Sequence, residues 1–558
     1  MNKIFKVIKH KGIVQGTRVV SERASGVGKT QKEGACVDDI GFEEAAKRLY
    51  FFSHAWLKYT LGMVLVSSFM TTSTYAQIVA DTNAPKNQQA TVLTTASGAT
   101  QVDIQTPTQK GISINQYRQF NTQSNGTILN NSRTNTKTTS AGWIQGNPWL
   151  AKGEAKATVN QINSSDPSKL TGVLEVAGSK ADVIIANPSG IVVDGLTLLN
   201  AQRSTLTTGA LQIDQGEVRG YNVRQGEIHI EGTGLDARGS DYTALLSQAA
   251  TINANIHAQD LAIITGENKI SSDLSSLEKH PSAAPAVQGI SIDTKALGGM
   301  YANHIRLIGT QQGMGVNHEG VVHAQTLTLS SDGKLTNTGL IASTKQHIQA
   351  NDVENAGTIS SKEQNILDVN KTLHNTRTIS SERELIAHTN NLSNSGTINA
   401  PRLDLSTQTL INDKGVIAQS GFNGLDISTA KLTNTNHALI GSFQDKASVF
   451  EETPTINDTT TASSGAVVTT QTIPAQTSSS SQGAAPLARG RIVVGESIVN
   501  TEGKITGSDV TLNIHAELKN HHASTINVST LNHDGTRLEN LDSTMLVNQV
   551  SPLVLEHF

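Results

Sequence analysis

Aliphatic and polar residues alternate with a regular long-range period in the second half of the chain. A unit of the form aliphatic-x-Asn-x-Gly-x-Ile begins at Leu335, Val353, Leu373, Leu392 and Ile411, and a degenerate sixth copy begins at Leu432. The Asn or Asp positions of successive copies are 18, 20, 19, 19 and 21 residues apart. Alternate aliphatic side chains point to one face of a strand, whereas Asn and Gly favour turns. The pattern therefore predicts a strand-and-turn unit repeated about every 19 residues.

A single unit of this size cannot bury its own apolar face, so neighbouring units must stack into a solenoid. Stacked turns about 4.8 Å apart would pair each strand with the turns before and after it. We expect an all-β chain that forms a right-handed parallel β-helix, with roughly 19 turns between residues 77 and 447. A leucine-rich horseshoe is the competing solenoid, but its repeat needs more leucines than these units contain.

Earlier in the chain, residues 111–209 contain short aliphatic runs that end at Asn, Pro or Gly. Examples are Val183-Ile184-Ile185 and the run that follows Gly190. Such runs are typical of buried strands separated by tight turns. Two Asn-Pro pairs, at 147–148 and 187–188, predict turns in which proline fixes φ and asparagine satisfies local backbone groups.

The first 76 residues have the pattern of an extended signal peptide. A basic start is followed, after a polar segment, by an apolar run from Leu61 to Met70 and then by small residues that end at Ala76. The run is too short to span a membrane, which needs about 20 apolar residues. We expect cleavage between Ala76 and Gln77.

The composition of the chain argues against several classes of protein and site. Charged residues make up 16% of the chain and the formal net charge is −4, which argues against a nucleic-acid binder with a basic surface. The single cysteine, Cys36, lies in the predicted leader, so the mature chain would have neither a disulfide scaffold nor a thiolate metal site.

Motifs for catalysis and cofactor binding are incomplete or missing. The segment from Ser25 to Thr30 ends like a phosphate-binding loop, but Arg23 stands where the first glycine is required. HExxH, GxSxG and calcium-loop patterns are absent. His521 and His522 are adjacent, and neighbouring residues of a strand point to opposite faces, so they are poorly placed to share a metal. We expect no enzymatic activity, no cofactor and no metal.

Several landmarks resemble the secretion domain of filamentous-haemagglutinin-like exoproteins of the two-partner secretion (TpsA) family. They include the opening G-x-S-x-N-x-Y-x-x-F-N from Gly111, the run Ile128-Leu129-Asn130-Asn131-Ser132 and the two Asn-Pro motifs. In the family these motifs are approximately NPNL and NPNGI. This chain departs from them at Trp149 and Ser189, which replace the second Asn of each motif.

The resemblance implies a capped N-terminal secretion domain, export through the Sec translocon and the periplasm, and recognition by a TpsB-type outer-membrane barrel with POTRA domains. The candidate recognition residues are those of the two motifs. They are Asn147, Pro148, Trp149, Leu150, Asn187, Pro188, Ser189, Gly190 and Ile191. The same residues could instead serve only to hold their turns.

The expected organisation has five parts. They are the signal peptide at 1–76, the secretion domain at 77–320, haemagglutinin-type repeats at 321–450, a Ser/Thr/Pro-rich linker at 451–491 and further turns at 492–558. The last part repeats the aliphatic-x-Asn pattern at Asn500, Asn520 and Asn540. Because relatives run much longer, the chain is interpreted either as a short member or as a truncated one.

The resemblance implies a secreted or surface-exposed adhesin that attaches to a receptor on host or bacterial cells. Three alternatives use the same export pathway. They are the stalk of a contact-dependent growth inhibition toxin, a haemolysin and a haem-acquisition exoprotein.

Overall fold

The computed structural model describes residues 6–8, 18–20, 78–280, 289–421, 424–443 and 490–550. The chain divides into two compact units, Met1–Thr74 and Tyr75–Phe558. In the first, β1 (Lys6–Ile8) pairs antiparallel with β2 (Arg18–Val20). The predicted cleavage site at Ala76 and Gln77, and nearly all of the predicted linker at 451–491, lie outside the described residues.

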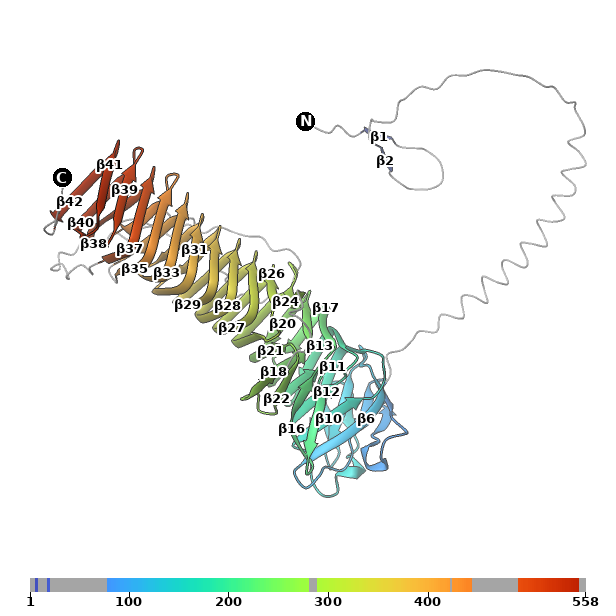
Figure 1. Ribbon diagram of the computed structural model, residues 1–558. Coiled ribbons are helices and arrows are strands. Elements are labelled where there is room, and N and C mark those ends of the chain that lie inside the picture. The colour runs from blue at the N-terminus through green and yellow to red at the C-terminus, as the bar shows by residue number, and fades with distance from the viewer. Residues whose placement is uncertain are drawn as a thin grey trace, which may run out of the picture. The chain divides into compact units, whose positions relative to one another are not determined.

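The second unit is a parallel β-helix of about 16 turns, which confirms the predicted fold class. Its colours run in order from the blue N-terminal end to the red C-terminal end (Figure 1). Long strands in the repeat region are β27 (Val321–Asn337), β28 (Leu340–Asn355) and β29 (Thr358–Asn375), and each pairs in parallel with the next. Sequence-adjacent turns are therefore spatial neighbours.

The earlier elements of this unit are as follows. They are β3 (Ile78–Ala80), η1 (Lys86–Gln88), β4 (Thr91–Thr94), β5 (Thr100–Asp103), β6 (Ile112–Phe120), β7 (Thr127–Asn131), β8 (Thr136–Thr138), β9 (Gly142–Ile144), η2 (Pro148–Leu150), β10 (Ala157–Ile162), β11 (Ser168–Gly178), β12 (Ala181–Ala186), β13 (Ile191–Leu199), β14 (Ala201–Thr207), β15 (Ala210–Asp214), β16 (Glu217–Val223), β17 (Glu227–Ala237), β18 (Ser240–Ser247), β19 (Ala249–Ile252), β20 (Asn255–Ala258), β21 (Asp260–Thr265), β22 (Asn268–Ser271), β23 (Leu277–Lys279), β24 (Gly289–Thr294), β25 (Gly299–Gly309) and β26 (Met314–His318).

The later elements follow β29. They are β30 (Thr378–Ser381), β31 (Glu384–Asn394), β32 (Thr397–Ala400), β33 (Arg402–Asp413), β34 (Val416–Ser420), β35 (Leu425–Thr435), β36 (Leu439–Phe443), β37 (Gly490–Thr501), β38 (Lys504–Ile514), β39 (Glu517–His521), β40 (Thr525–His533), β41 (Arg537–Leu541) and β42 (Thr544–Val550).

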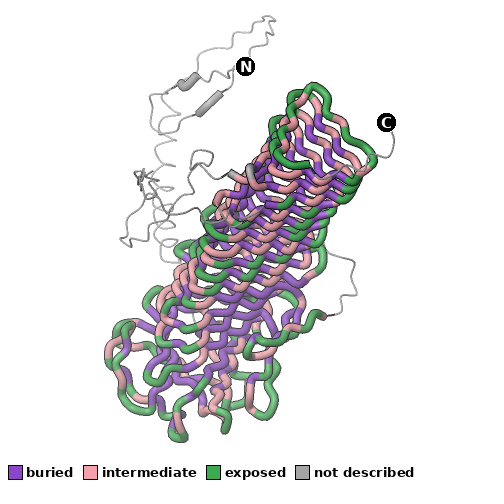
Figure 2. The backbone as a smooth tube through the Cα atoms, turned by 90° about the vertical axis from the view of Figure 1, so that its left-hand side faces the viewer, coloured by how far each residue is buried: buried purple, intermediate pink, exposed green. Residues whose placement is uncertain are grey.

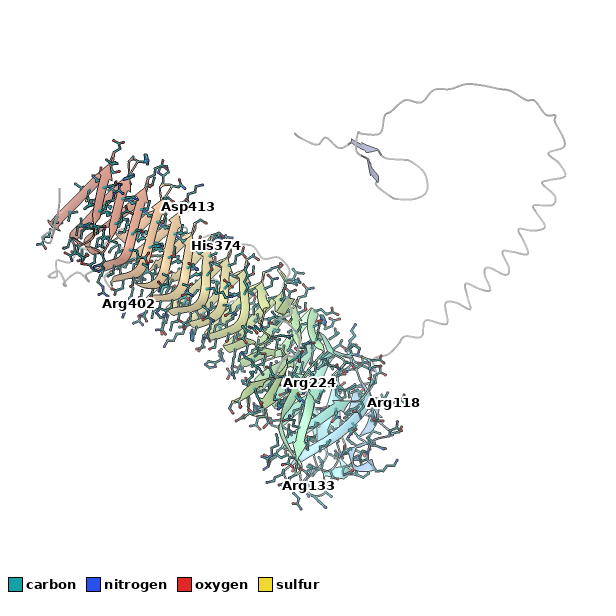
Figure 3. The ribbon with its side chains drawn as sticks, in the orientation of Figure 1. Arg118, Arg133, Arg224, His374, Arg402 and Asp413 are labelled. Carbon is teal, nitrogen blue, oxygen red and sulfur yellow. The ribbon has the colours of Figure 1, made fainter. Side chains whose placement is uncertain are left out.

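Aliphatic side chains stack in columns along the inside of the rod. One column contains Ile341, Ile359, Ile379, Ile398, Ile417, Ile440, Ile505 and Ile526, each at most 1% exposed. In Figure 2, purple buried residues alternate along the strands with pink half-buried ones, and many green exposed residues lie at the corners. Charged side chains such as Arg224 and Arg402 lie on the outside (Figure 3). Burial of such aliphatic side chains contributes about 1.5–3 kcal/mol each.

A ladder of buried asparagines joins the turns at one corner. Each Nδ2 donates to Oδ1 of the asparagine one turn later, over 2.6–2.9 Å. The buried members are Asn337, Asn355, Asn375, Asn394, Asn412, Asn434, Asn500 and Asn520, and the ladder ends at the exposed Asn540. Asn375, for example, also donates to the Thr397 carbonyl of the next turn at 3.2 Å. The repeat asparagines therefore form hydrogen bonds both with one another and with backbone carbonyls of the corner.

The ladder corrects the predicted register of the fifth repeat. Leu410 and Asn412 occupy the inward positions, paired with Leu432 and Asn434, whereas Ile411 is 41% exposed. The sequence pattern placed Ile411 and Asp413 there. The corner holds one extra residue, Lys414, whose φ of 61° accommodates the insertion. The other repeat asparagines take their predicted places.

The solenoid continues without a missing turn across residues 444–489. Strand β35 pairs directly with β37, and Asn434 Nδ2 donates to Asn500 Oδ1 at 2.9 Å. The ladder thus joins two residues that are 66 apart in sequence.

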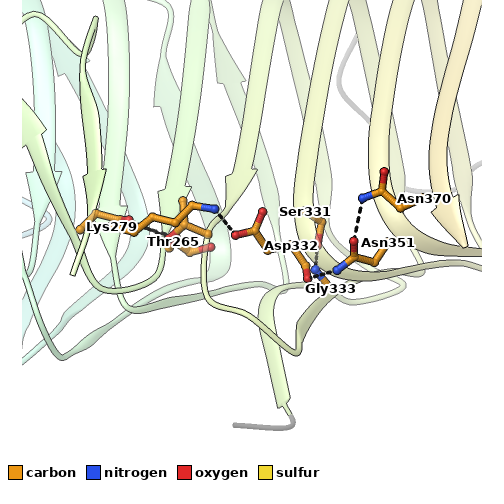
Figure 4. Close-up of polar contacts among 9 residues, drawn as sticks. Thr265, Lys279, Ser331, Asp332, Gly333, Asn351 and Asn370 are labelled. Carbon is orange, nitrogen blue, oxygen red and sulfur yellow. Dashed lines mark hydrogen bonds and ion pairs between the residues drawn. The ribbon is translucent and has the colours of Figure 1, made fainter. Parts of the chain in front are cut away.

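A second ladder, half-buried at Asn351 and exposed at Asn370 and Asn390, marks another corner of the same turns. Asn370 Nδ2 donates to Asn351 Oδ1 at 2.8 Å, and Asn390 Nδ2 donates to the Asn370 carbonyl at 2.8 Å. Asn351 in turn donates to the Asp332 carbonyl, and Lys279 forms an ion pair with the Asp332 carboxylate (Figure 4). Polar side chains therefore line up from turn to turn on the outside as well.

The N-terminal turns are longer than the repeat period, which is why the described chain has fewer turns than predicted. Two excursions form a four-stranded antiparallel sheet, β15-β16-β22-β23. Its residues Val218, Tyr221 and Ile270 pack over apolar outward-facing residues of the solenoid, including Ile184 and Leu246. This sheet adds a second apolar core to the part of the chain that is predicted as the secretion domain.

A short cap covers the first turn. Strand β3 pairs antiparallel with β6, and β4 pairs antiparallel with β5. The reversed direction of these strands ends the parallel stack on the N-terminal side.

His318 occupies the ladder column one turn before Asn337. Its Nε2 donates to the Leu340 carbonyl at 3.1 Å, and the ring is 2% exposed. Burial lowers the pKa of His318 to about 4. Among the described residues, Asn337 Oδ1 has no hydrogen-bond partner, since the preceding turn supplies no amide.

We predict that Asn375→Ala lowers the free energy of unfolding by about 2 kcal/mol, because it leaves buried partners on both neighbouring turns unsatisfied. The shift in the urea midpoint measures this. Asn390→Ala makes the same chemical change at an exposed site and should shift the midpoint by less than a quarter as much. Equal shifts would contradict a stabilising role for the buried ladder.

Acidification should destabilise the rod through His318. The His318 ring takes up a proton near pH 6.5 in the unfolded chain and only near pH 4 in the folded chain. The contribution of the neutral ring to the free energy of unfolding is therefore fully present above pH 6.5 and decreases as the pH falls towards 4. The loss amounts to about 3 kcal/mol. His318→Asn should remove this part of the pH dependence in thermal melts at pH 7 and pH 4.5, with exposed His323→Asn as the matched control. An unchanged pH dependence in His318→Asn would contradict the assignment.

Candidate functional site

The first Asn-Pro motif forms a tight turn that ties the solenoid to its cap. Asn147 precedes the 3-10 helix η2, and its Oδ1 accepts from Trp149 N at 2.9 Å. Its Nδ2 donates to the carbonyls of Ile104 and Asn130, both at 2.9 Å. Leu150, at the end of η2, is fully buried. The Asn147 amide therefore holds the turn, the chain after β5 and the strand β7 together.

The second motif repeats this arrangement where β12 ends. Asn187 Oδ1 accepts from Ser189 N at 2.9 Å. Its Nδ2 donates to the Asp166 carbonyl at 2.9 Å and to Ser168 Oγ at 3.0 Å, in the corner one turn earlier. Ile191 begins β13 and is fully buried. Each motif is thus an asparagine-capped turn bonded to the adjacent coil.

Glycine is required in the second turn. Gly190 has a φ of 115°, which L side chains rarely adopt, and a Cβ there would lie 3.2 Å from the Glu227 carbonyl. The Gly190 carbonyl accepts from Ser168 N at 3.0 Å. This position brings three successive turns into close contact.

The nine predicted recognition residues differ in accessibility. Asn147, Leu150, Asn187, Gly190 and Ile191 are buried. The other four reach the surface to different extents: Pro148 and Trp149 are exposed, and Pro188 and Ser189 are half-buried. The turns lie after different strands, and among the described residues no hydrogen bond joins one turn to the other. The structure brings each motif together but not the two motifs with each other.

Sequence reasoning did not single out the polar residues beneath the first turn. Asn130 Nδ2 donates to Asp103 Oδ1 at 2.7 Å, and Asn131 Oδ1 accepts from Ala155 N at 2.7 Å. All three side chains are buried. The sequence places Asn130 and Asn131 in the run that resembles the family. It gives no indication of a role for Asp103, because its partner Asn130 lies 27 residues away.

A buried carboxylate fixes a hairpin beside this turn. Glu175 is 7% exposed, and it accepts hydrogen bonds from Thr139 N at 2.8 Å and from Ser140 N at 3.0 Å. These residues form the tip between β8 and β9. The hairpin buries Ile144 and leaves Trp143 73% exposed.

Among the described residues, no group of three or more His, Cys, Asp or Glu side chains is arranged to hold a metal ion. His522 lies in the turn after β39 with a φ of 56°, rather than on the strand as predicted. Within the described ranges, no helix is both long and apolar enough to span a membrane.

These asparagine-capped turns belong to a capped β-helical domain, and comparison with known proteins identifies it. Residues 76–337 match the family described as the TPS secretion domain. Over these residues the chain therefore carries the secretion domain of the two-partner secretion (TpsA) family.

Relatives with assigned names are much longer. The chain is 41% identical over 355 residues to Toxin CdiA from Yersinia pestis, an alignment that covers 63% of this chain and 10% of the relative. It is 38% identical over 338 residues to tRNA nuclease CdiA-2 from Burkholderia pseudomallei (strain 1026b), which covers 58% of this chain and 10% of that protein. The chain thus spans about a tenth of the length of these relatives.

Two solved structures are also similar. The crystal structure of the filamentous hemagglutinin secretion domain shares 26% identity, with 60% of this chain and 99% of that chain covered and a TM-score of 0.44. The HMW1 secretion domain from Haemophilus influenzae shares 12% identity, with 85% of this chain and 99% of that chain covered and a TM-score of 0.24.

We predict that Asn187→Asp is at least as destabilising as Asn187→Ala. Aspartate keeps the acceptor for Ser189 N but loses both donor contacts and buries a charge, which should cost about 2 kcal/mol or more. Ser189→Ala removes one half-buried hydroxyl and should shift the urea midpoint by less than half as much. A wild-type midpoint for Asn187→Asp would contradict the assigned donor role.

Proposed function

We propose that this chain is the exported β-helical part of a two-partner exoprotein, carried across the outer membrane by a cognate TpsB-type transporter. The observation that supports this most directly is the secretion-domain match over residues 76–337, which contains both asparagine-capped turns. The predicted leader would deliver the chain to the periplasm by the Sec translocon, and POTRA domains of the barrel would receive it there. The product would reside at the cell surface or in the medium.

Folding on the outer side would favour export. Each new turn pairs its strands with the previous turn, buries another set of aliphatic side chains and adds one asparagine to the ladder. Because every added turn is stabilised by the turn already present, folding can advance in one direction. The chain after the predicted leader has no cysteine, so no disulfide loop would form before passage through a pore.

The motif residues would contribute to recognition in two ways. Asn147 and Asn187 are buried, so in the folded domain they would act by holding their turns. Trp149 is 43% exposed and Ser189 is half-buried, so these side chains would contact the partner directly. In an unfolded chain in the periplasm, all nine residues would be accessible to the transporter.

For the mature rod, we favour a stalk in a toxin-delivery exoprotein of contact-dependent growth inhibition. Supporting this, the relatives that are 41% and 38% identical are named Toxin CdiA and tRNA nuclease CdiA-2. The described residues form a structural β-helix, and an activity of that kind would have to reside outside them.

An adhesin that binds host or bacterial cell-surface receptors is the second candidate. It is favoured by the second ladder of Asn351, Asn370 and Asn390, which presents the same side chain at successive turns. Amides repeated at a spacing of about 4.8 Å would offer a receptor a row of hydrogen-bonding groups.

Deletion of residues 77–320 tests the export proposal. We expect the shortened protein to be absent from the cell surface and the culture medium, whereas deletion of residues 321–450 should leave detectable export. Immunodetection in fractionated cells, with and without the transporter gene, measures both. Undiminished release after the first deletion would overturn the proposal.

Growth competition distinguishes the stalk from the adhesin. Cells that express the complete gene with its transporter should reduce the viability of co-cultured cells that lack it, if the rod is a toxin stalk. Attachment to those cells without loss of viability would favour the adhesin instead.

A further inference from the structure

One excursion from the solenoid concentrates exposed positive charge. Between β7 and β10, residues 132–156 contain four Lys and Arg but only one acidic residue, Glu154, so the segment carries a net charge of +3 in a chain of net charge −4. The four cations are all exposed, and they are Arg133, Lys137, Lys152 and Lys156. Within the described residues, none of them forms an ion pair. Their charge therefore faces solvent without a carboxylate to balance it.

An exposed tryptophan lies among these cations. Trp143 is 73% exposed, and it stands directly opposite Lys137 in the β8–β9 hairpin. Residues opposite each other in such a pair share one face. The other face of the hairpin buries Ile144 in a small cluster with Ile128 and Ala177. The face that carries Trp143 and Lys137 therefore points away from the solenoid.

Hydrogen bonds join the hairpin to η2, so the excursion forms one support. Asn135 Oδ1 accepts from Gly146 N at 3.1 Å, at the base of the hairpin. Arg133 Nη2 donates to the Ala151 carbonyl at 3.4 Å, beside Lys152. Arg133 lies at the outer edge of this end of the rod (Figure 3). The positions of the cations are thus set by the fold of the excursion.

We propose that this surface, namely Arg133, Lys137, Trp143 and Lys152, is a docking site for a lipid bilayer that carries anionic phosphate headgroups. The cations would contact phosphate oxygens, and the Trp143 indole would insert among the headgroups. Lys and Arg are attracted to anionic lipid surfaces, and the amphipathic ring of tryptophan favours the membrane–water interface. Contact with lipid would orient this end of the rod towards a membrane, but the contact itself does not require a transporter.

The combination of residues favours a lipid surface over a protein partner. Lysine is depleted in protein–protein interfaces, whereas it is enriched where proteins contact anionic membranes. Glu175, the acidic residue beside the hairpin tip, is buried and accepts hydrogen bonds from Thr139 N and Ser140 N. Its carboxylate therefore does not face the bilayer and does not oppose binding at the surface.

Co-sedimentation with vesicles tests the surface. The protein used is residues 77–558, which lie within the second compact unit and lack the apolar run of the predicted leader. It should bind vesicles of phosphatidylglycerol and phosphatidylcholine but not vesicles of phosphatidylcholine alone. Salt at about 1 M, where the Debye length is about 3 Å, should weaken this binding by roughly tenfold or more.

A pair of triple variants identifies the residues that bind. The first combines Arg133→Gln, Lys137→Gln and Lys152→Gln, and it should bind anionic vesicles roughly tenfold more weakly or worse, because each cation near the surface adds to the attraction. The matched control makes the same change in charge at exposed cations of the repeat region, and it combines Lys362→Gln, Lys371→Gln and Arg377→Gln. The control should bind like the wild type, and thermal melts establish that both variants remain folded. Wild-type binding by the first variant, or an equal loss in both, would overturn the proposal.

Tryptophan emission provides a second measurement. In residues 77–558 the tryptophans are Trp143 and Trp149, so Trp149→Phe leaves Trp143 as the only emitter. Its emission should shift to shorter wavelength when anionic vesicles are added. Trp143→Ser should weaken vesicle binding, whereas Leu297→Ser, at a residue that is 77% exposed, should not. An unshifted emission from vesicle-bound protein would overturn the proposed docking face.

The outcomes separate this inference from the export proposal. A folded wild-type protein that does not bind anionic vesicles overturns the lipid site and assigns the exposed cations no membrane role. The export proposal is then unaffected, because it is tested by deletion of residues 77–320 and by removal of the transporter gene.

Discussion

The structure depends on hydrogen bonding between neighbouring turns, because each turn must supply partners for the polar groups of the turn beside it. Strand backbones do so by parallel pairing, and at one corner a buried amide does so through the asparagine ladder. Asn375 shows the constraint: it accepts from Asn355 at 2.7 Å and donates to Asn394 at 2.7 Å. A slip of one residue would turn the inward aliphatic side chains outward and break this chain of amides. Register is therefore fixed jointly by apolar burial and by hydrogen bonding.

This constraint acts between turns, so it tolerates many additional residues in the sequence between one strand and the next. Residues 444–489 separate β36 from β37 in the sequence, but Asn434 still donates a hydrogen bond to Asn500. The excursions that form β15, β16, β22 and β23 go further and build a second core on the outside. The rod can carry such additions because the ladder and the aliphatic columns resume at the next turn.

The secretion-domain region uses the same chemistry for a different purpose. Asn147 and Asn187 each bond to their own turn and to a neighbouring segment, so they position the surface around them rather than contribute to it. Trp149 illustrates the division of roles, because its backbone N–H is held by Asn147 while its indole lies on Thr91 of the cap. Stability and exposure are therefore combined in adjacent residues of one motif.

Local sequence was sufficient for the repeat, the strand-and-turn alternation and the two Asn-Pro turns. These features depend on side-chain alternation and turn preference over a few residues. It was not sufficient at Ile411, because both Ile411-x-Asp413 and Leu410-x-Asn412 satisfy the pattern, and only packing against Leu432 and Asn434 selects the second. It also could not place Trp149 on Thr91, 58 residues away, or Glu175 under the β8–β9 tip. Such contacts join distant segments, and their geometry is set only when the coil has closed and neighbouring turns have come into register.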